Sequence, residues 1–274
     1  MSIFLTILGT RGSLPNTAAA CASFGGATSC YHMDIGNSHL IFDAGSGIVE
    51  LGAHLVQTNQ SKVIDLFITH FHYDHIMGLP FFAPLFEEDW QVRIWSSSLF
   101  GPKALDEALD RLFSAPLCPI TRDDLKADIS LNVIDQYGEM ELQNNVWLAT
   151  IPLLHPGGNA AFRITRNNHS IVYSGDFEHG DRSLDDAFIE FMSDADYALL
   201  DCTYSPQSYR DAKGYGHAHW KAAGELAKQA NVREWIGVHH KHLLDDITLL
   251  QVEAQIQREY PNGKLAREGM TFTI

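Results

Sequence analysis

Histidine and aspartate crowd into one short stretch of this 274-residue chain. In "FITHFHYDHIMGLP", residues 67–80, four side chains that can bind a metal ion fall within six positions: His70, His72, Asp74 and His75. They directly follow the apolar run 66–69, which is typical of a buried strand, and loops at strand ends are where catalytic side chains usually lie. Imidazole and carboxylate ligands without cysteine suit Zn²⁺, Mn²⁺ or Fe, and they argue against a closed structural zinc site. The stretch therefore predicts a reactive metal centre.

The spacing within this stretch favours two ions rather than one. His70 and His72 project to the same side of an extended segment, because side chains alternate with a period of two. Asp74 and His75 open the helix expected next and turn toward a second position. The alternative, a solvated surface run of histidines, is disfavoured by the strand and helix that frame the cluster.

Three further segments end an apolar strand with a residue that can bind a metal ion. They are "IPLLHPGG" with His155, "IVYSGDFE" with Asp176, and "WIGVHHKH" with His239 and His240. A single histidine after a strand is more often a cap or a solvated loop residue. The recurrence of this pattern beside the first cluster favours one shared site.

Strands and helices are expected in mixed order, which predicts an α/β fold with helices outside the sheets. The expected strands are 2–8, 38–43, 64–69, 92–95, 129–134, 146–151, 161–165, 170–175, 197–200 and 234–239. The expected helices are 46–57, 74–86, 102–113, 183–192, 217–230 and 245–258. "RNNHS" at 166–170 reads as a hairpin turn, and Ser183 with Asp186 as the start of the fourth helix.

Composition narrows the class of partner. The net charge is −15, and no cluster of lysine or arginine appears, whereas proteins that bind long nucleic acids usually carry a basic stripe. The apolar runs are much shorter than the roughly 20 residues that span a bilayer, and the N-terminus lacks the pattern of a signal peptide. Four scattered cysteines predict free thiols in a cytoplasmic protein with no membrane partner.

The combined motifs resemble the metallo-β-lactamase-fold hydrolases over nearly the whole chain. The resemblance rests on the H-x-H-x-D-H run and on the later His, Asp and His. "GTRGSLP" (9–15), "FGGATSCYHM" (24–33), "IFDAGSGI" (41–48) and "LDCTYSPQSYRDAKGYGHAHW" (200–220) resemble the branch with ribonuclease Z and related phosphodiesterases. The resemblance implies a four-layer αββα sandwich, which we expect to form a single domain over residues 1–274.

The same resemblance implies a ligand set for two divalent metal ions, with Zn²⁺ expected and Mn²⁺ or Fe as alternatives. One ion would be held by His70, His72 and His155, and the other by Asp74, His75 and His239. Asp176 would bridge them. His240 remains the alternative to His239, because the register is uncertain by one residue.

Two such ions, roughly 3.5–4 Å apart, activate a water molecule as the nucleophile and clamp the oxygens of a phosphodiester. We expect His217 to donate a proton to the leaving oxygen and Asp201 to orient it, so the catalytic residues are Asp74, His217 and Asp201. His217 would start the helix 217–230. His219 departs from the family pattern, which has a hydroxyl residue there, and this departure puts the substrate in doubt more than the reaction.

The leading hypothesis is a metal-dependent phosphodiesterase acting on a small phosphodiester such as a cyclic nucleotide. A transfer-RNA 3′-processing endonuclease ranks below it, because the chain is acidic and shows no basic, glycine-rich insertion. A thioesterase or lactamase on the same fold is third, since His217 has no obvious use there. The fourth hypothesis is not an enzyme: the fold would serve as a non-catalytic sensor module. The resemblance also allows a homodimer.

Overall fold

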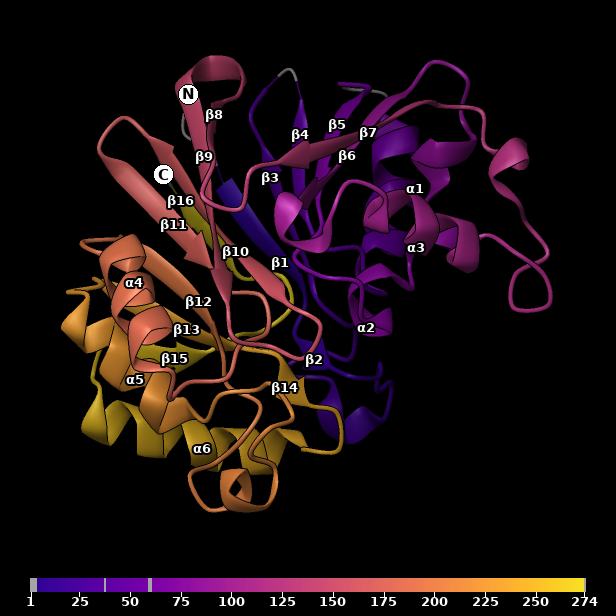
Figure 1. Ribbon diagram of the computed structural model, residues 1–274. Helices are drawn as coiled ribbons and strands as arrows, with labels where there is room; N and C mark the ends of the chain where they lie inside the picture. Colours follow the sequence, from indigo (N-terminus) through magenta and orange to yellow (C-terminus); the bar gives the residue numbers. More distant parts are fainter. Residues whose placement is uncertain (1–3, 37, 59–60, 274) are drawn as a thin grey trace.

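A computed structural model describes residues 4–36, 38–58 and 61–273. Two seven-stranded sheets lie face to face, and helices cover their outer sides (Figure 1). The chain therefore forms the four-layer αββα sandwich that the sequence predicted. The first two residues of the expected strand 2–8 lie outside the described residues.

The first sheet is built mainly from the N-terminal half and has the order β16-β1-β3-β4-β5-β6-β7. Its central and far strands, from β4 to β7, run parallel to one another. The strands are β16 (Thr271–Thr273), β1 (Phe4–Gly9), β3 (Cys30–Asp34), β4 (His39–Phe42), β5 (Val63–Phe67), β6 (Gln91–Ser97) and β7 (Asp128–Ile134).

The second sheet comes from the C-terminal half and has the order β15-β13-β12-β11-β10-β9-β8. Its strands from β11 to β15 are parallel, and those from β8 to β11 are antiparallel hairpins. The strands are β15 (Gly263–Leu265), β13 (Glu234–Val238), β12 (Tyr197–Asp201), β11 (His169–Tyr173), β10 (Asn159–Arg166), β9 (Val146–Leu153) and β8 (Glu139–Glu141).

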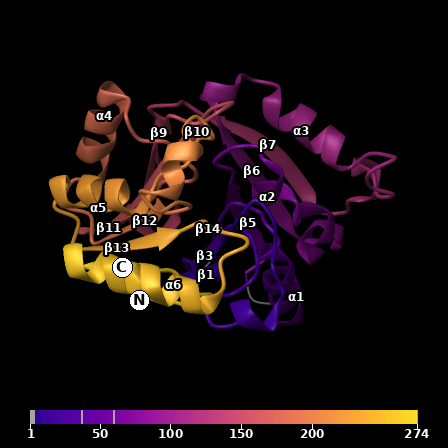
Figure 2. The same ribbon diagram turned by 90° about the horizontal axis from the view of Figure 1, so that it is seen from below.

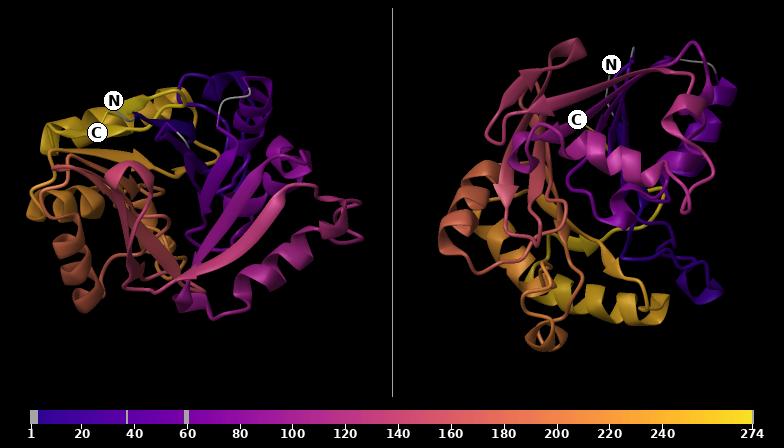
Figure 3. Two further views of the ribbon diagram at one scale, coloured as in Figure 1. Left: turned by 90° about the horizontal axis from the view of Figure 1, so that it is seen from above. Right: turned by 45° about the vertical axis from the view of Figure 1, so that its right-hand side comes forward.

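Three apolar cores hold these layers together. The middle core, which includes Phe42, Phe67 and Phe162, lies between the two sheets. The first sheet buries its outer face against α1 (Ile48–Thr58) and α3 (Ala104–Leu112). The second buries its outer face against α4 (Arg182–Met192), α5 (Trp220–Gln229) and α6 (Asp246–Glu259), as the views in Figures 2 and 3 show.

The parallel strands of both sheets send their carboxyl-terminal loops to one edge of the sandwich. There a small pair, β2 (Arg11–Gly12) with β14 (His240–Lys241), links the two halves of the chain. The short helix α2 (Tyr73–Ile76) follows β5 at this same edge. Loops at the ends of parallel strands are a common place for ligand sites in α/β folds.

Most predicted elements are confirmed to within two residues at each described end. The hairpin at 166–170 is confirmed between β10 and β11, with Asn167 at φ 55°. The short strands β2, β3, β8, β14, β15 and β16 were not predicted. All four cysteines are free and buried, as expected.

One predicted helix, the start of another and one cap are wrong. The stretch 74–86 is α2 followed by two short 3₁₀ turns, because Pro80 and Pro84 cannot donate the bonds that a longer helix needs. The helix predicted at 217–230 begins at Trp220, since a β-bridge between Tyr204 and His219 keeps the preceding residues extended. The cap of α4 is Asp181 rather than Ser183.

No helix in the described ranges combines the length and the apolar character that crossing a membrane would require.

Candidate metal centre

Seven side chains from four segments converge where the two sheets meet at the β2–β14 edge. We refer to them as the candidate metal centre: His70, His72, Asp74, His75, His155, Asp176 and His239. His72 is the N-cap residue of α2, which places Asp74 and His75 in its single turn. His70 follows β5, and His155, Asp176 and His239 follow β9, β11 and β13. Sequence reasoning named each of these residues, and the structure brings all of them together.

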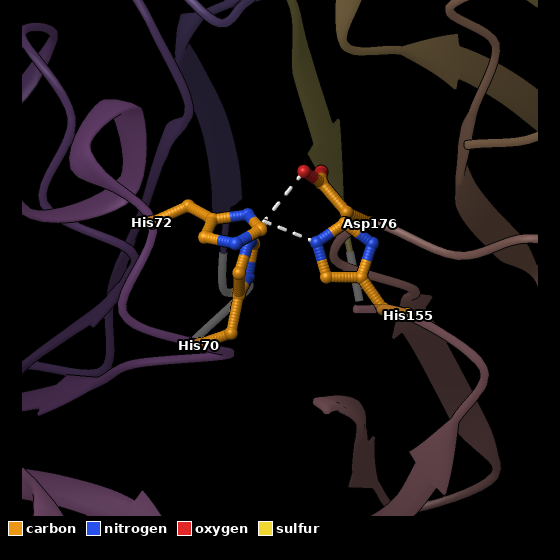
Figure 4. Close-up of side chains that lie close together, drawn as sticks. All are labelled: His70, His72, His155 and Asp176. Carbon is orange, nitrogen blue, oxygen red and sulfur yellow. Dashed lines mark hydrogen bonds and ion pairs between the residues drawn. The ribbon is translucent and has the colours of Figure 1, made fainter. Parts of the chain in front are cut away.

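The first half of the centre consists of His70, His72, His155 and Asp176 (Figure 4). His155 Nε2 and His72 Nδ1 lie 3.0 Å apart, and His70 Nε2 lies 3.5 Å from Asp176 Oδ2. Their potential ligand atoms all lie within 4.8 Å of one another. His70 and Asp176 are each 2% exposed whereas His72 is exposed, so this half is buried on one side and open to solvent on the other.

The second half consists of Asp74, His75, His239 and, again, Asp176. Asp176 Oδ2 lies 3.3 Å from both His75 Nε2 and His239 Nε2, and Asp74 Oδ2 lies 3.1 Å from His239 Nε2. Asp176 thus belongs to both halves. This shared carboxylate is the arrangement expected of a residue that bridges two ions.

The residues present fit divalent cations. His70 Nε2 and His75 Nε2 are buried and make no hydrogen bond to any described residue. Burying an unpaired polar atom costs free energy, and a bound metal ion would remove that cost. Burial lowers the pKa of His155 to about 4, so its ring is neutral at neutral pH and keeps a lone pair. Burial would also lower the pKa of His75, but the neighbouring carboxyl groups of Asp176, Asp43 and Asp74 raise it, which marks a site that favours positive charge.

Asp43 orients two of the histidines from behind. His75 Nδ1 donates to Asp43 Oδ2 at 2.7 Å, which turns Nε2 toward the centre. The Thr69 hydroxyl also donates to Asp43, and it lies 3.0 Å from His70 Nδ1. The Tyr173 hydroxyl donates to the same carboxyl group. Such contacts fix the tautomer and direction of a ligand histidine.

Asp201 holds His239 through an equivalent threonine. The Thr203 hydroxyl donates to Asp201 Oδ1 at 2.7 Å and lies 2.8 Å from His239 Nδ1. His239 packs closely against β2, where a Cβ on Gly12 would come within 2.1 Å of its ring. The element "GTRGS" therefore needs glycine at this position.

His217 lies beside the centre, with Nδ1 donating to Asp201 Oδ2 at 2.8 Å. Burial alone would lower the pKa of His217, but the charge and hydrogen bond of Asp201 raise it to about 9. Its ring stacks on that of His239 at a centroid distance of 4.8 Å. The contacts with Asp201 thus favour the protonated form of this imidazole beside the candidate metal centre.

Glu178 is a residue that sequence reasoning missed. Its buried carboxyl group accepts hydrogen bonds from the Tyr209 hydroxyl and from the backbone N–H groups of Gly214 and Gly216. The Gly216 carbonyl in turn accepts from His155 Nδ1 at 2.7 Å. Glu178 therefore closes the loop that orients His155 and leads into His217. Only its position two residues after Asp176 could have suggested it.

The remaining candidates lie elsewhere. His240 Nε2 bonds the Ala266 carbonyl and belongs to neither half, so of the two adjacent histidines only His239 faces the centre. His219 Nδ1 accepts from Ala222 N and caps α5, and thereby takes a structural role. The Tyr204 ring lies edge-on to the ring of His217, with the two ring centroids 6.1 Å apart. Asp245 caps α6.

Comparison with known proteins places this geometry in context. A family model described as the beta-lactamase superfamily domain matches residues 39–240. The chain is 25% identical to ribonuclease Z from Picrophilus torridus over 313 aligned residues, which take in 98% of this chain and 95% of that protein.

Two solved structures share the fold. The metallo-beta-lactamase fold protein YhfI from Bacillus subtilis superposes with a TM-score of 0.76 at 20% identity, covering 100% of this chain and 99% of its own. A diphosphatase from the PhnP family superposes with a TM-score of 0.70 at 18% identity, covering 98% and 97%. At these identities the likeness concerns the fold alone.

Proposed function

We propose that this chain cleaves a small phosphodiester. The premise is that it belongs to the beta-lactamase superfamily and is a hydrolase of the metallo-β-lactamase fold. A cyclic nucleotide is one substrate of that kind. The observation that carries the proposal is the position of His217, hydrogen-bonded to Asp201, beside two ligand groups that share Asp176.

The two halves of the candidate metal centre would hold two divalent ions, for which we propose Zn²⁺, with Mn²⁺ or Fe as alternatives. Bound there, such ions would supply Lewis acidity toward the phosphoryl oxygens and lower the pKa of a water nucleophile. The protein's own part is to fix the ligand directions. Asp43 and Thr69 do so on one side, and Thr203 and Gly216 on the other.

His217 would supply the proton that the leaving oxygen needs. Its Nδ1 is occupied by Asp201, so Nε2 is the atom free to donate. The charge and hydrogen bond of Asp201 raise the pKa of His217 against the effect of burial, and so favour the protonated ring that a proton donor needs. Proton donation by a positioned histidine contributes about 10²–10⁴ in rate. A lactamase or thioesterase on this fold would have no evident use for His217.

The charge of the chain supports a small substrate. With 34 acidic and 19 basic residues, the surface repels a polyanion, while a single phosphodiester could still be attracted to a cationic centre.

Transfer-RNA 3′ processing is the second candidate, favoured by the 25% identity to a ribonuclease Z. We rank it lower, because a long RNA requires basic contacts along its backbone. Cleavage of an unmodified precursor tRNA at physiological salt would reverse this order.

A panel of substrates tests the proposal. Protein reconstituted with Zn²⁺ or Mn²⁺ is assayed against bis(p-nitrophenyl) phosphate, a p-nitrophenyl thioester, nitrocefin and precursor tRNA. We expect turnover of the phosphodiester to exceed that of the other three. Preferred hydrolysis of the thioester or the lactam would contradict the proposal, and bound metal without any turnover would point to a sensor module.

A further inference from the structure

A cavity of about 460 Å³ opens next to the candidate metal centre, between the loop 203–208 and α6. Its size falls within the range of small-molecule sites. The floor is apolar and includes Leu249 and Val252, whereas the walls carry hydroxyl and amide groups. A mixed lining of this kind suits a ligand with a flat apolar body and hydrogen-bonding edges.

The cavity and the metal centre share a wall. Thr203, which bonds His239, lines the cavity, and so does Tyr204, whose ring contacts that of His217. A substrate whose phosphate lies at the centre can extend past the Tyr204 side chain toward this cavity.

Lys241 adds a positive charge to the cavity wall. It follows His239 by two residues, and its Nζ lies 5.6 Å from the centre of the Tyr204 ring. It makes no ion pair with any residue that the structure describes. In a chain with net charge −15, a lysine left without a carboxylate partner beside a phosphodiester site is free to meet an anionic or carbonyl group of a ligand.

The facing wall is one side of α6. Gln251 and Gln255 are one turn apart, so both amides border the cavity together with Thr248. An amide donates and accepts at once, which matches the alternating donors and acceptors along the edge of a nucleobase. A hydrocarbon tail would leave these groups and Lys241 unpaired.

We infer that this cavity binds the nucleoside part of the substrate, which makes a nucleotide diester the substrate class. The inference rests on the proposed function for its link to catalysis, but binding of a nucleoside can be measured without any turnover.

The test compares two esters that release the same p-nitrophenolate: bis(p-nitrophenyl) phosphate and thymidine 5′-monophosphate p-nitrophenyl ester. We expect the native protein to favour the nucleotide ester in kcat/KM by about tenfold or more. Lys241→Ala and the double variant Gln251→Ala/Gln255→Ala should remove most of that preference by raising KM. Alanine preserves helix α6. The matched control, Gln229→Ala on the exposed part of α5, should keep the preference.

Saturation-transfer NMR with thymidine alone separates the two hypotheses. Transfer to the base protons should be seen with the native protein and weaken in both cavity variants. If neither ester is cleaved but the saturation transfer weakens in the cavity variants as expected, the cavity does bind a nucleoside and the proposed phosphodiesterase activity is wrong. If the esters are cleaved but the cavity variants change neither the preference nor the transfer, the nucleoside inference is overturned.

Discussion

Asp201 accepts a hydrogen bond from His217 Nδ1 at 2.8 Å, and the same carboxyl group reaches His239 through Thr203. One buried aspartate thus orients both a proposed proton donor and a proposed metal ligand. A change at Asp201 is therefore expected to affect two functions at once, whereas a change at His217 should affect only one.

Replacing His217 tests the proton donor in isolation. We expect His217→Ala to lower kcat for a diester with an alkoxide leaving group, such as a 2′,3′-cyclic nucleotide, by about 10²–10⁴, because that oxygen must be protonated as it leaves. Bound metal, measured by elemental analysis, should stay unchanged. His169→Ala, in the exposed β10–β11 hairpin, serves as the control. Full activity in His217→Ala would remove the residue from the mechanism.

Replacing Thr203 tests how the ligand direction is fixed. Thr203→Val keeps the shape but removes the hydroxyl that joins His239 to Asp201. We expect metal affinity to fall about 10–100-fold, as measured by competition with a chelator. Thr150→Val is the matched control, since the Thr150 hydroxyl is buried and has no partner among the described residues. Equal affinity in both variants would show that the link is unimportant.

Glu178 is predicted to hold the loop that carries Gly214 and Gly216. A glutamine can no longer accept all the hydrogen bonds that the carboxylate accepts, so Glu178→Gln should loosen the loop. Trypsin should then cut faster at Arg210 and Lys213, and kcat/KM should fall. The exposed Glu225→Gln gives the baseline. Unchanged proteolysis would argue that the loop is held by other contacts.

A pair of histidines outside the centre, His39 buried and His32 half-buried, predicts acid sensitivity. His32 Nε2 lies 3.0 Å from His39 Nδ1, and burial lowers the pKa of His32 to about 3. In the unfolded chain His32 therefore binds a proton below its ordinary pKa of 6.5. In the folded chain it stays neutral until the pH nears 3. Stability contributed by this group is present above pH 6.5 and is lost as the pH falls toward 3.

The expected loss from His32 is about 2 kcal/mol between pH 6.5 and pH 5. Urea unfolding at these two pH values measures it as a change in the free energy of unfolding. His32→Gln should lose correspondingly less than the native protein, while the exposed His54→Gln should keep most of the loss, because His54 is the smallest of the causes that lower the pKa of His32. Identical pH slopes for native protein and His32→Gln would contradict the prediction.

Much of the site could be predicted because metal ligands come with short, local patterns. The run from His70 to His75 is visible in six letters, and His155, Asp176 and His239 each follow an apolar strand. The choice between His239 and His240 was not accessible in this way. The backbone at His239 has φ 58°, so the alternation of β13 stops there, and only the structure tells which ring faces inward.

Other features depend on contacts between distant segments. Glu178 acts on Gly216 across 38 residues, and the cavity beside Tyr204 is completed by α6. Neither leaves a periodic signal in the sequence. The helix expected at 217–230 fails for a similar reason, because a bridge to Tyr204 holds His219 extended against its local preference.

The most direct test of the account is a metal titration of chelator-treated protein, followed by hydrolysis of bis(p-nitrophenyl) phosphate. We predict no turnover without metal and a rise that reaches its plateau at two equivalents of Zn²⁺ or Mn²⁺ per chain, in keeping with two ligand groups that share Asp176. Turnover that survives removal of the metal, or a plateau at one equivalent, would contradict the two-ion phosphodiesterase.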